Sequence, residues 1–207
     1  MTKLLFVSGS LRAASSSTAT CRAFIEALGA RADCNLAEIG SLPLYNADHD
    51  GGAPVAAWKD AVEAAGGLVF VTPEYNYSVP GVLKNAIDWA SRPAYESVFK
   101  GKPCLVVSVS GGALGGVRAQ SHLKYILHGM LADVFPCQEV VIPHAPKKVE
   151  NGVLADEAAV SFGTRALETF IARVSDDVRP GVRSQKPAGG QFPGSVREIP
   201  RMAERRA

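Results

Sequence analysis

The chain has 207 residues, of which 47% are hydrophobic and 20% charged, and its formal net charge is +2. This length and composition predict one globular domain with a substantial core. The small charge argues against nucleic acid as a partner, and no apolar run approaches the length of a membrane span. The four cysteines are scattered without a C-x-x-C pair, which indicates reduced thiols. A cytoplasmic enzyme or carrier is the first expectation.

The first predicted strand, from Lys3 to Val7, leads into a hydroxyl-rich segment and then into a helix that runs through Leu28. Backbone N–H groups at a helix N-terminus attract anions, and Arg12 can add a charge-assisted hydrogen bond. A phosphate monoester would fit here. The alternative is a serine-rich helix cap with no ligand. The segment contains neither G-x-G-x-x-G nor G-x-x-x-x-G-K-[ST], which argues against a dinucleotide or a nucleoside triphosphate at this loop.

A short second strand is predicted from Asn35 to Ile39, and a helix from about Val55 to Ala65. The loop between them contains Asp48, His49 and Asp50, three residue types that ligate metals. Adjacent residues on one loop without a distant partner rarely form a metal site, so we expect solvated surface and no metal.

The third predicted strand, Leu68 to Val71, is continuously apolar, as expected for a parallel strand covered on both faces. The following loop, 73–77, offers two aromatic rings and an amide, which suits a flat heteroaromatic ligand. The alternative is a loop that packs on itself. The helix that follows continues to Ala90, and we expect Ser78 to cap it and Pro80 to lie in its first turn.

A fourth strand is predicted from Pro103 to Val109, and the glycine-rich loop 110–116 follows it. The next helix, to about Leu131, carries Arg118. The fifth strand, 134–142, is broken by a proline, and the last helix covers 156–174. Alternating strands and helices predict an α/β fold, a doubly wound five-stranded parallel sheet with helices on both faces. Three strand-to-helix loops would then converge on one rim, where such sheets bind ligands.

Residues 1–178 are expected to form this domain, and 179–207 a basic tail rich in Pro and Gly. The tail has seven Lys and Arg residues against two Glu residues, a charge of +5. We expect it to be disordered or loosely docked. A polyanion-binding arm is less favoured, because the basic residues are dispersed.

Four segments resemble one known family: 9–15, 42–46, PEYNYSVPGVLKNAIDW at 73–89, and 110–119. They resemble the NADPH-dependent FMN reductase family, which has a flavodoxin-like fold and includes quinone, chromate and azo-dye reductases. One position departs from the family pattern, because Ser17 stands where the family has asparagine. Serine can still donate to a phosphate.

The resemblance implies FMN as cofactor and NADPH or NADH as hydride donor. The implied phosphate-binding residues are Ser10, Leu11, Arg12, Ser15, Ser16 and Ser17. The implied ring-binding residues are Pro73, Glu74, Tyr75 and Asn76 on one edge, and Ser110, Gly111 and Gly112 on another. Arg118 is the candidate for steering NADPH or an anionic acceptor. No catalytic side chain is expected, because hydride transfer is the chemistry of the flavin.

The expected function is an FMN-dependent NAD(P)H oxidoreductase acting on a small-molecule quinone, flavin, azo or metal-oxyanion acceptor. The alternative is a flavodoxin-type electron carrier, although carriers tend to be acidic and this sequence has a pI of about 8.4. The resemblance also implies a homodimer or homotetramer, in which Tyr45, Tyr77 and Trp89 would offer apolar surface near the site.

Overall fold

The computed structural model describes residues 1–177, so the predicted basic tail lies outside the described residues. Its centre is a parallel sheet in the order β2-β1-β3-β4-β5, with β6 also paired to β4. The strands are β1 Lys3–Ser8, β2 Asp33–Leu36, β3 Gly67–Pro73, β4 Pro103–Val109, β5 Asp133–Val134 and β6 Val140–Ile142. This is the flavodoxin-like strand order, and the predicted fold class is confirmed.

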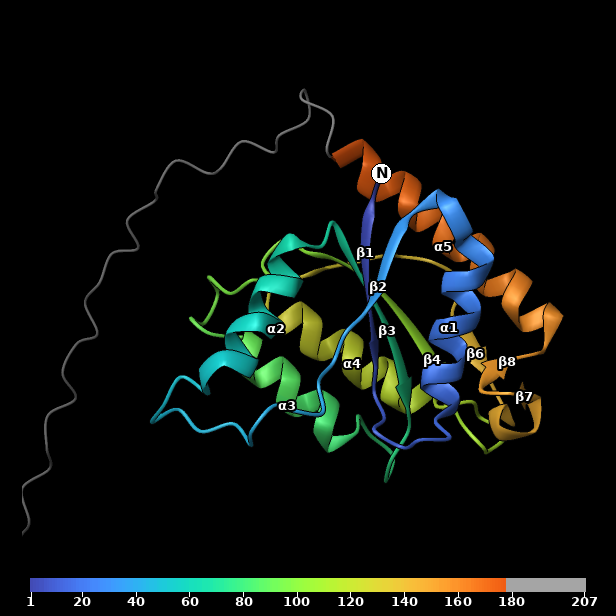
Figure 1. Ribbon diagram of the computed structural model, residues 1–207, viewed down its shortest axis with the longest axis horizontal. Helices are drawn as coiled ribbons and strands as arrows, with labels where there is room; N and C mark the ends of the chain where they lie inside the picture. The colour runs from blue at the N-terminus through green and yellow to red at the C-terminus, as the bar shows by residue number, and fades with distance from the viewer. Residues whose placement is uncertain (178–207) are drawn as a thin grey trace, which may run out of the picture.

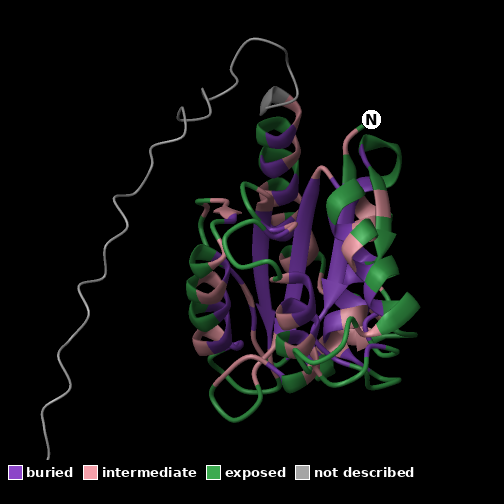
Figure 2. Cartoon of the chain, turned by 90° about the vertical axis from the view of Figure 1, so that its left-hand side faces the viewer, coloured by how far each residue is buried: buried purple, intermediate pink, exposed green. Residues whose placement is uncertain are grey.

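Helices cover both faces of the sheet (Figure 1). One face carries α1 Ser16–Leu28 and α5 Glu157–Asp177, and the other carries α2 Gly52–Ala64, α3 Gly81–Ala90 and α4 Val117–Gly129. Alternation along β1 explains the two layers, since Leu4 and Phe6 pack toward α1 and α5 while Leu5 and Val7 pack toward α2 and α3. The sheet is accordingly buried on both sides (Figure 2). None of the helices within residues 1–177 is long and apolar enough to cross a membrane.

Two strand predictions were only partly right. The second strand, predicted at 35–39, begins and ends earlier, because Lys3 to Phe6 of β1 pair with Asp33 to Leu36. The predicted fifth strand divides around Pro136 into β5 and β6, which pair with opposite ends of β4. Proline lacks the N–H that a continuous ladder requires. A small hairpin of β7 Val149–Glu150 and β8 Val153–Leu154 was not predicted.

The predicted cap of α3 was wrong. The helix is capped at Pro80 without a side-chain hydrogen bond, and the Ser78 hydroxyl instead lies 3.0 Å from Nδ1 of His122. The backbone of Ser78 is already held in a turn with Tyr75, which keeps it out of the helix. Trp89 was also misplaced as surface: it is 3% exposed, and its indole N–H donates to the carbonyl of Pro43.

Strand register brings the predicted ligand loops to one edge. Ser8 at the end of β1 is level with Val71 of β3, and Pro73 at the end of β3 is level with Val109 of β4. The loops after β1, β3 and β4 therefore leave adjacent strands at the same rim, at the bottom of the view in Figure 1.

Candidate functional site

The segment from Gly9 to Ser17, here called the phosphate loop, lies against the loop that follows β3. The N–H of Gly9 donates to the carbonyl of Val71 at 2.9 Å. A Cβ added at Gly9 would lie 2.8 Å from Cδ of Pro73, so only glycine allows this approach. Farther along, the hydroxyls of Ser10 and Tyr75 lie 3.3 Å apart. The structure thus brings predicted phosphate-binding and ring-binding residues together.

The phosphate loop ends in a helix N-terminus whose donors are mostly unused. Ser15 caps α1 by accepting from the N–H of Thr18 at 3.1 Å. Within residues 1–177, the N–H groups of Ser16 and Ser17 make no hydrogen bond and the Arg12 guanidinium has no acceptor. The Ser17 hydroxyl is buried, with the residue only 1% exposed, and has no partner among the described residues.

This donor set fits a phosphate monoester. An anion at this helix end would use free backbone N–H groups, a favourable helix dipole and a guanidinium. The first turn of α1 contains no acidic residue that would oppose it. A buried hydroxyl without a partner costs stability unless something else satisfies it. The Ser17 hydroxyl therefore supports a ligand at this loop.

The loop after β3 forms a tight two-residue hairpin. Tyr75 and Ser78 exchange both backbone hydrogen bonds at 3.0 Å, and Asn76 and Tyr77 between them have φ of 48° and 67°. Positive φ at both central residues identifies a type I′ turn, which usually carries glycine at the second position. Tyr77 occupies that position at a steric cost, with its side chain exposed and the Arg118 guanidinium 4.1 Å from its ring centre.

Glu74 ties this hairpin to the start of α4. We call the contact of Glu74 with Arg118 and the first turn of α4 the carboxylate clamp. The carboxylate, 9% exposed, accepts from Nε of Arg118 at 2.8 Å and from the N–H groups of Arg118 and Ala119 at 3.2 and 3.4 Å. Burial raises the pKa of Glu74, but the hydrogen bonds from Arg118 and Ala119 outweigh it and hold the pKa below its ordinary value.

The clamp was not foreseen from the sequence. Glu74 as a ring-binding residue and Arg118 as the candidate for steering NADPH or an anionic acceptor both stay predictions. The structure pairs Arg118 with Glu74 and places its guanidinium over the ring of Tyr77, with the Arg118 side chain 42% exposed. Forty-four positions separate the two partners, and no local pattern links them.

The glycine-rich loop 110–116 is held mainly by the segment after β6. Ser110 donates to the carbonyl of Ile142 at 3.1 Å and its own carbonyl accepts from Ala145 at 2.9 Å. The Ser110 hydroxyl accepts from the N–H of Gly112 at 3.1 Å. At Gly111 and Gly112 an added Cβ would meet no atom closer than 3.7 Å. A Cβ at either position would therefore make only ordinary van der Waals contacts.

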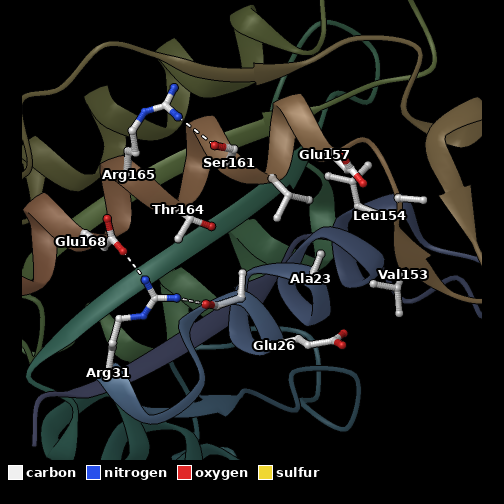
Figure 3. Close-up of a pocket in the computed structure, with 13 residues that line it drawn as sticks. Ala23, Glu26, Arg31, Val153, Leu154, Glu157, Ser161, Thr164, Arg165 and Glu168 are labelled. Atoms are coloured by element: carbon white, nitrogen blue, oxygen red, sulfur yellow. Dashed lines mark hydrogen bonds and ion pairs between the residues drawn. The ribbon is translucent and has the colours of Figure 1, made fainter.

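A hollow of about 460 Å³ adjoins the phosphate loop and is lined in part by Ser10, Leu11 and Arg12. A larger hollow of about 630 Å³ lies elsewhere, between α1 and α5 (Figure 3), and none of the predicted site residues lines it. Arg31 there pairs with Glu168 and Arg165 with Ser161. Among residues 1–177, no group of three or more His, Cys, Asp or Glu side chains could hold a metal ion.

Comparison with known proteins agrees with this arrangement. Residues 2–147 match the model of a family described as NADPH-dependent FMN reductase. The chain is 40% identical over 181 residues to an NAD(P)H-dependent FMN reductase of Pseudomonas aeruginosa, covering 83% of this chain and 96% of that one. It is 37% identical over 177 residues to a 2-hydroxy-1,4-benzoquinone reductase of a Burkholderia species, covering 84% and 97% of the two chains.

Among solved structures, the chain resembles a flavoenzyme NAD(P)H:(acceptor) oxidoreductase from Paracoccus denitrificans. The TM-score is 0.76 and the sequence identity 32%, over 85% of this chain and 98% of that one. Sequence and fold therefore point to the same group of proteins.

Proposed function

Because the chain belongs to the NADPH-dependent FMN reductase family, we propose that it uses FMN to move electrons from NAD(P)H to a small-molecule acceptor. The acceptor class is a quinone, a flavin, an azo compound or a metal oxyanion. The observation that supports this best is the set of unpartnered donors in the phosphate loop, above all the buried hydroxyl of Ser17. A flavin phosphate bound there would accept hydrogen bonds from these donors.

In this proposal the phosphate loop holds the FMN phosphate. Ser10, Arg12 and Ser17 would donate from their side chains, and the first N–H groups of α1 from the backbone. Leu11 and Ser15 shape the loop, since Ser15 already caps the helix. When bound, FMN supplies the chemistry of the reaction, by accepting a hydride from NAD(P)H and releasing electrons to the acceptor. Identification of the flavin released by heat tests this, with FMN expected and FAD as sole species contradicting it.

The loops after β3 and β4 would place the flavin ring. Pro73, Tyr75 and Asn76 would line one edge with the hairpin backbone, and residues 110–112 another. Glu74 acts on the ring through the clamp, because its carboxylate is used by the start of α4. No side chain is assigned a proton-transfer role, and the residues named here bind, orient and exclude water.

A flavodoxin-type electron carrier is not favoured. The relatives above are named as reductases that act on small molecules.

We further propose that the protein works in the cytoplasm. All four cysteines are free of disulfides, as expected for a reducing compartment.

We also propose that the active unit is a homodimer or homotetramer. Large apolar side chains are exposed near the rim and on α4, among them Leu44 at 84%, Tyr77 at 68% and Tyr125 at 81%. Clusters of exposed apolar groups often mark interfaces. Light scattering combined with activity measured down to nanomolar concentration tests this. Full activity in a monomer would contradict it.

The main experiment is a steady-state screen on the purified, FMN-loaded protein. We expect NADPH or NADH oxidation with no other protein present, and stimulation by at least one acceptor of the four classes. Failure to oxidise either nicotinamide with any acceptor, in protein that retains FMN, would overturn the proposed function.

A further inference from the structure

The hollow beside the phosphate loop lies on the side that faces β2, away from the hairpin. Its walls come from the phosphate loop, the first two turns of α1 and residues 36–40, which begin with the last residue of β2. Neither the hairpin nor the loop after β4 contributes a residue to its lining. Its volume of about 460 Å³ is within the range of small-molecule sites. We call it the β2 hollow.

Several residues that line the β2 hollow carry hydroxyl groups. The hydroxyls of Ser8 and Thr18 lie 2.9 Å apart, and Ser8 is only 7% exposed. The Ser10 hydroxyl is also part of the lining. Each hydroxyl can donate one hydrogen bond and accept others, so these residues suit ribose or phosphate oxygens.

Two leucines among the lining residues are partly exposed. Leu11 is 59% exposed and Leu36 is 39% exposed. Exposed leucines are common singly. Two of them lining one hollow offer apolar contact to a flat base.

Charges of both signs line the hollow. Arg22 makes one hydrogen bond, a long one of 3.4 Å to the carbonyl of Gly152, and no ion pair with another residue of the described chain. Glu38 follows β2, and its Oε1 accepts from the N–H of Gly40 at 2.7 Å. In dinucleotide-binding α/β folds, an acidic residue near the second strand binds the ribose 2′-hydroxyl of NAD, or a nearby arginine accommodates the 2′-phosphate of NADP.

We propose that the β2 hollow binds the adenosine 2′-phosphate end of NADPH, since the missing G-x-G-x-x-G pattern argues only against a pyrophosphate on the phosphate loop itself. Arg22 would hold the 2′-phosphate, Glu38 a ribose hydroxyl, and Leu11 and Leu36 the adenine. Arg12 lines the same hollow, but the phosphate loop needs it for the FMN phosphate, so Arg22 is the residue that distinguishes NADPH from NADH. The inference rests on the proposed function, because it assigns a subsite to its hydride donor.

The test compares three variants of the full chain loaded with FMN. Arg22→Ala should lower the ratio of kcat/KM for NADPH to that for NADH about tenfold, since a charge-assisted contact to phosphate is lost. Arg22→Lys should recover part of the ratio. Lys100→Ala removes the same charge beside the start of β4, at the opposite edge of the sheet, and should leave the ratio unchanged.

Two inhibitors locate the phosphate. Against the unmodified enzyme, 2′,5′-ADP should inhibit more strongly than 5′-ADP, and Arg22→Ala should remove that difference. Leu36→Ala should weaken both inhibitors together, by about fivefold, because it touches only the base.

The outcomes show whether the hollow binds the 2′-phosphate of NADPH or the phosphate of FMN. If Arg22→Ala leaves the NADPH-to-NADH ratio and the inhibitor difference unchanged, the subsite is wrong. If it instead weakens FMN binding, the β2 hollow serves the flavin phosphate and the proposal is also wrong. The NADH arm separates these results from failure of the proposed function, in which neither nicotinamide would be oxidised.

Discussion

The N-termini of α1 and α4 lie at the same edge of the sheet, but only one of them has acceptors for its first backbone N–H groups. At α4 the N–H groups of Arg118 and Ala119 both donate to the Glu74 carboxylate. At α1 the N–H groups of Ser16 and Ser17 have no acceptor within residues 1–177, and a buried hydroxyl joins them. An ordinary helix start needs acceptors for its first donors. At α4 the chain itself provides the acceptors. At α1 the N–H groups of Ser16 and Ser17 are free to donate to a ligand.

From this contrast we infer a division between groups that stabilise the site and groups that are free to bind a ligand. Residues in the carboxylate clamp should contribute to stability with or without ligand. Residues of the phosphate loop should contribute chiefly to ligand affinity, and some should cost stability when the ligand is absent. Four substitutions or conditions can test this division.

The largest effect is expected at the clamp. Glu74→Ala removes a largely buried carboxylate and leaves its donors unpaired, which should lower the free energy of unfolding by about 2–3 kcal/mol. Urea denaturation of the flavin-free protein measures it. The control is Glu96→Ala, which breaks an exposed ion pair with Lys100 and should cost less than about 0.5 kcal/mol. Equal losses in the two variants would mean that the clamp does not stabilise the rim.

Arg12→Ala should show the opposite behaviour. We expect the Kd for FMN to rise about tenfold through loss of a contact to phosphate, with the free energy of unfolding of the flavin-free protein unchanged. Flavin fluorescence titration and urea denaturation give the two values. Arg165→Ala, an exposed arginine on α5, is the control for lost charge. An unchanged Kd would mean that serines and backbone hold the phosphate alone.

Ser17→Ala should have opposite effects on the stability of the flavin-free protein and on its affinity for FMN. Removing a buried hydroxyl that has no partner should raise the free energy of unfolding of the flavin-free protein by about 1 kcal/mol. The same change should weaken FMN binding severalfold. Thermal unfolding with and without FMN checks both signs. A loss of stability without ligand would show that the hydroxyl has a partner that we have not identified.

The smallest effect is the pH dependence of the clamp. The folded pKa of Glu74 is held below its ordinary value, so its stabilisation is fully present above that ordinary value and is lost as pH falls through the folded one. Glu74→Gln does not ionise. The stability difference between wild type and Glu74→Gln should therefore stay constant from about pH 7 to 5 and shrink below about pH 4. A difference that grows on acidification would contradict the sign.

Much of the fold could be predicted because buried strands and helices have local patterns of apolar residues. The apolar runs of β1, β3 and β4 gave their positions to within two residues, and buried parallel strands leave such runs. The strands at the two sides of the sheet were harder to predict. Residues 33–36 have no apolar pattern, since most of that strand is exposed, and only pairing with β1 fixes its register. The ends of an outer strand depend on its pairing partner, which cannot be identified from the residues of that strand alone.

The site divides in the same way. The phosphate loop could be proposed from the sequence because hydroxyls and an arginine before a helix form a local pattern, and its role in binding stays a prediction. The clamp could not be proposed, because Glu74 and Arg118 meet only after β3 and β4 pair. The hairpin at 75–78 left only a weak local signal, because Asn76 suits the first central position of a type I′ turn but the usual glycine is replaced by Tyr77.

The free donors at the start of α1 have a practical consequence for handling the protein. If the phosphate loop binds FMN as proposed, these donors should accept a flavin phosphate or an inorganic one, and phosphate or sulfate in a buffer should compete with FMN by mass action. The apparent Kd for FMN then grows by the factor one plus the anion concentration divided by its own dissociation constant. The same anions stabilise the flavin-free protein in a melting curve, since any ligand of the folded state does so. Flavin content after purification therefore depends on the salt chosen, and a zwitterionic amine buffer preserves it best.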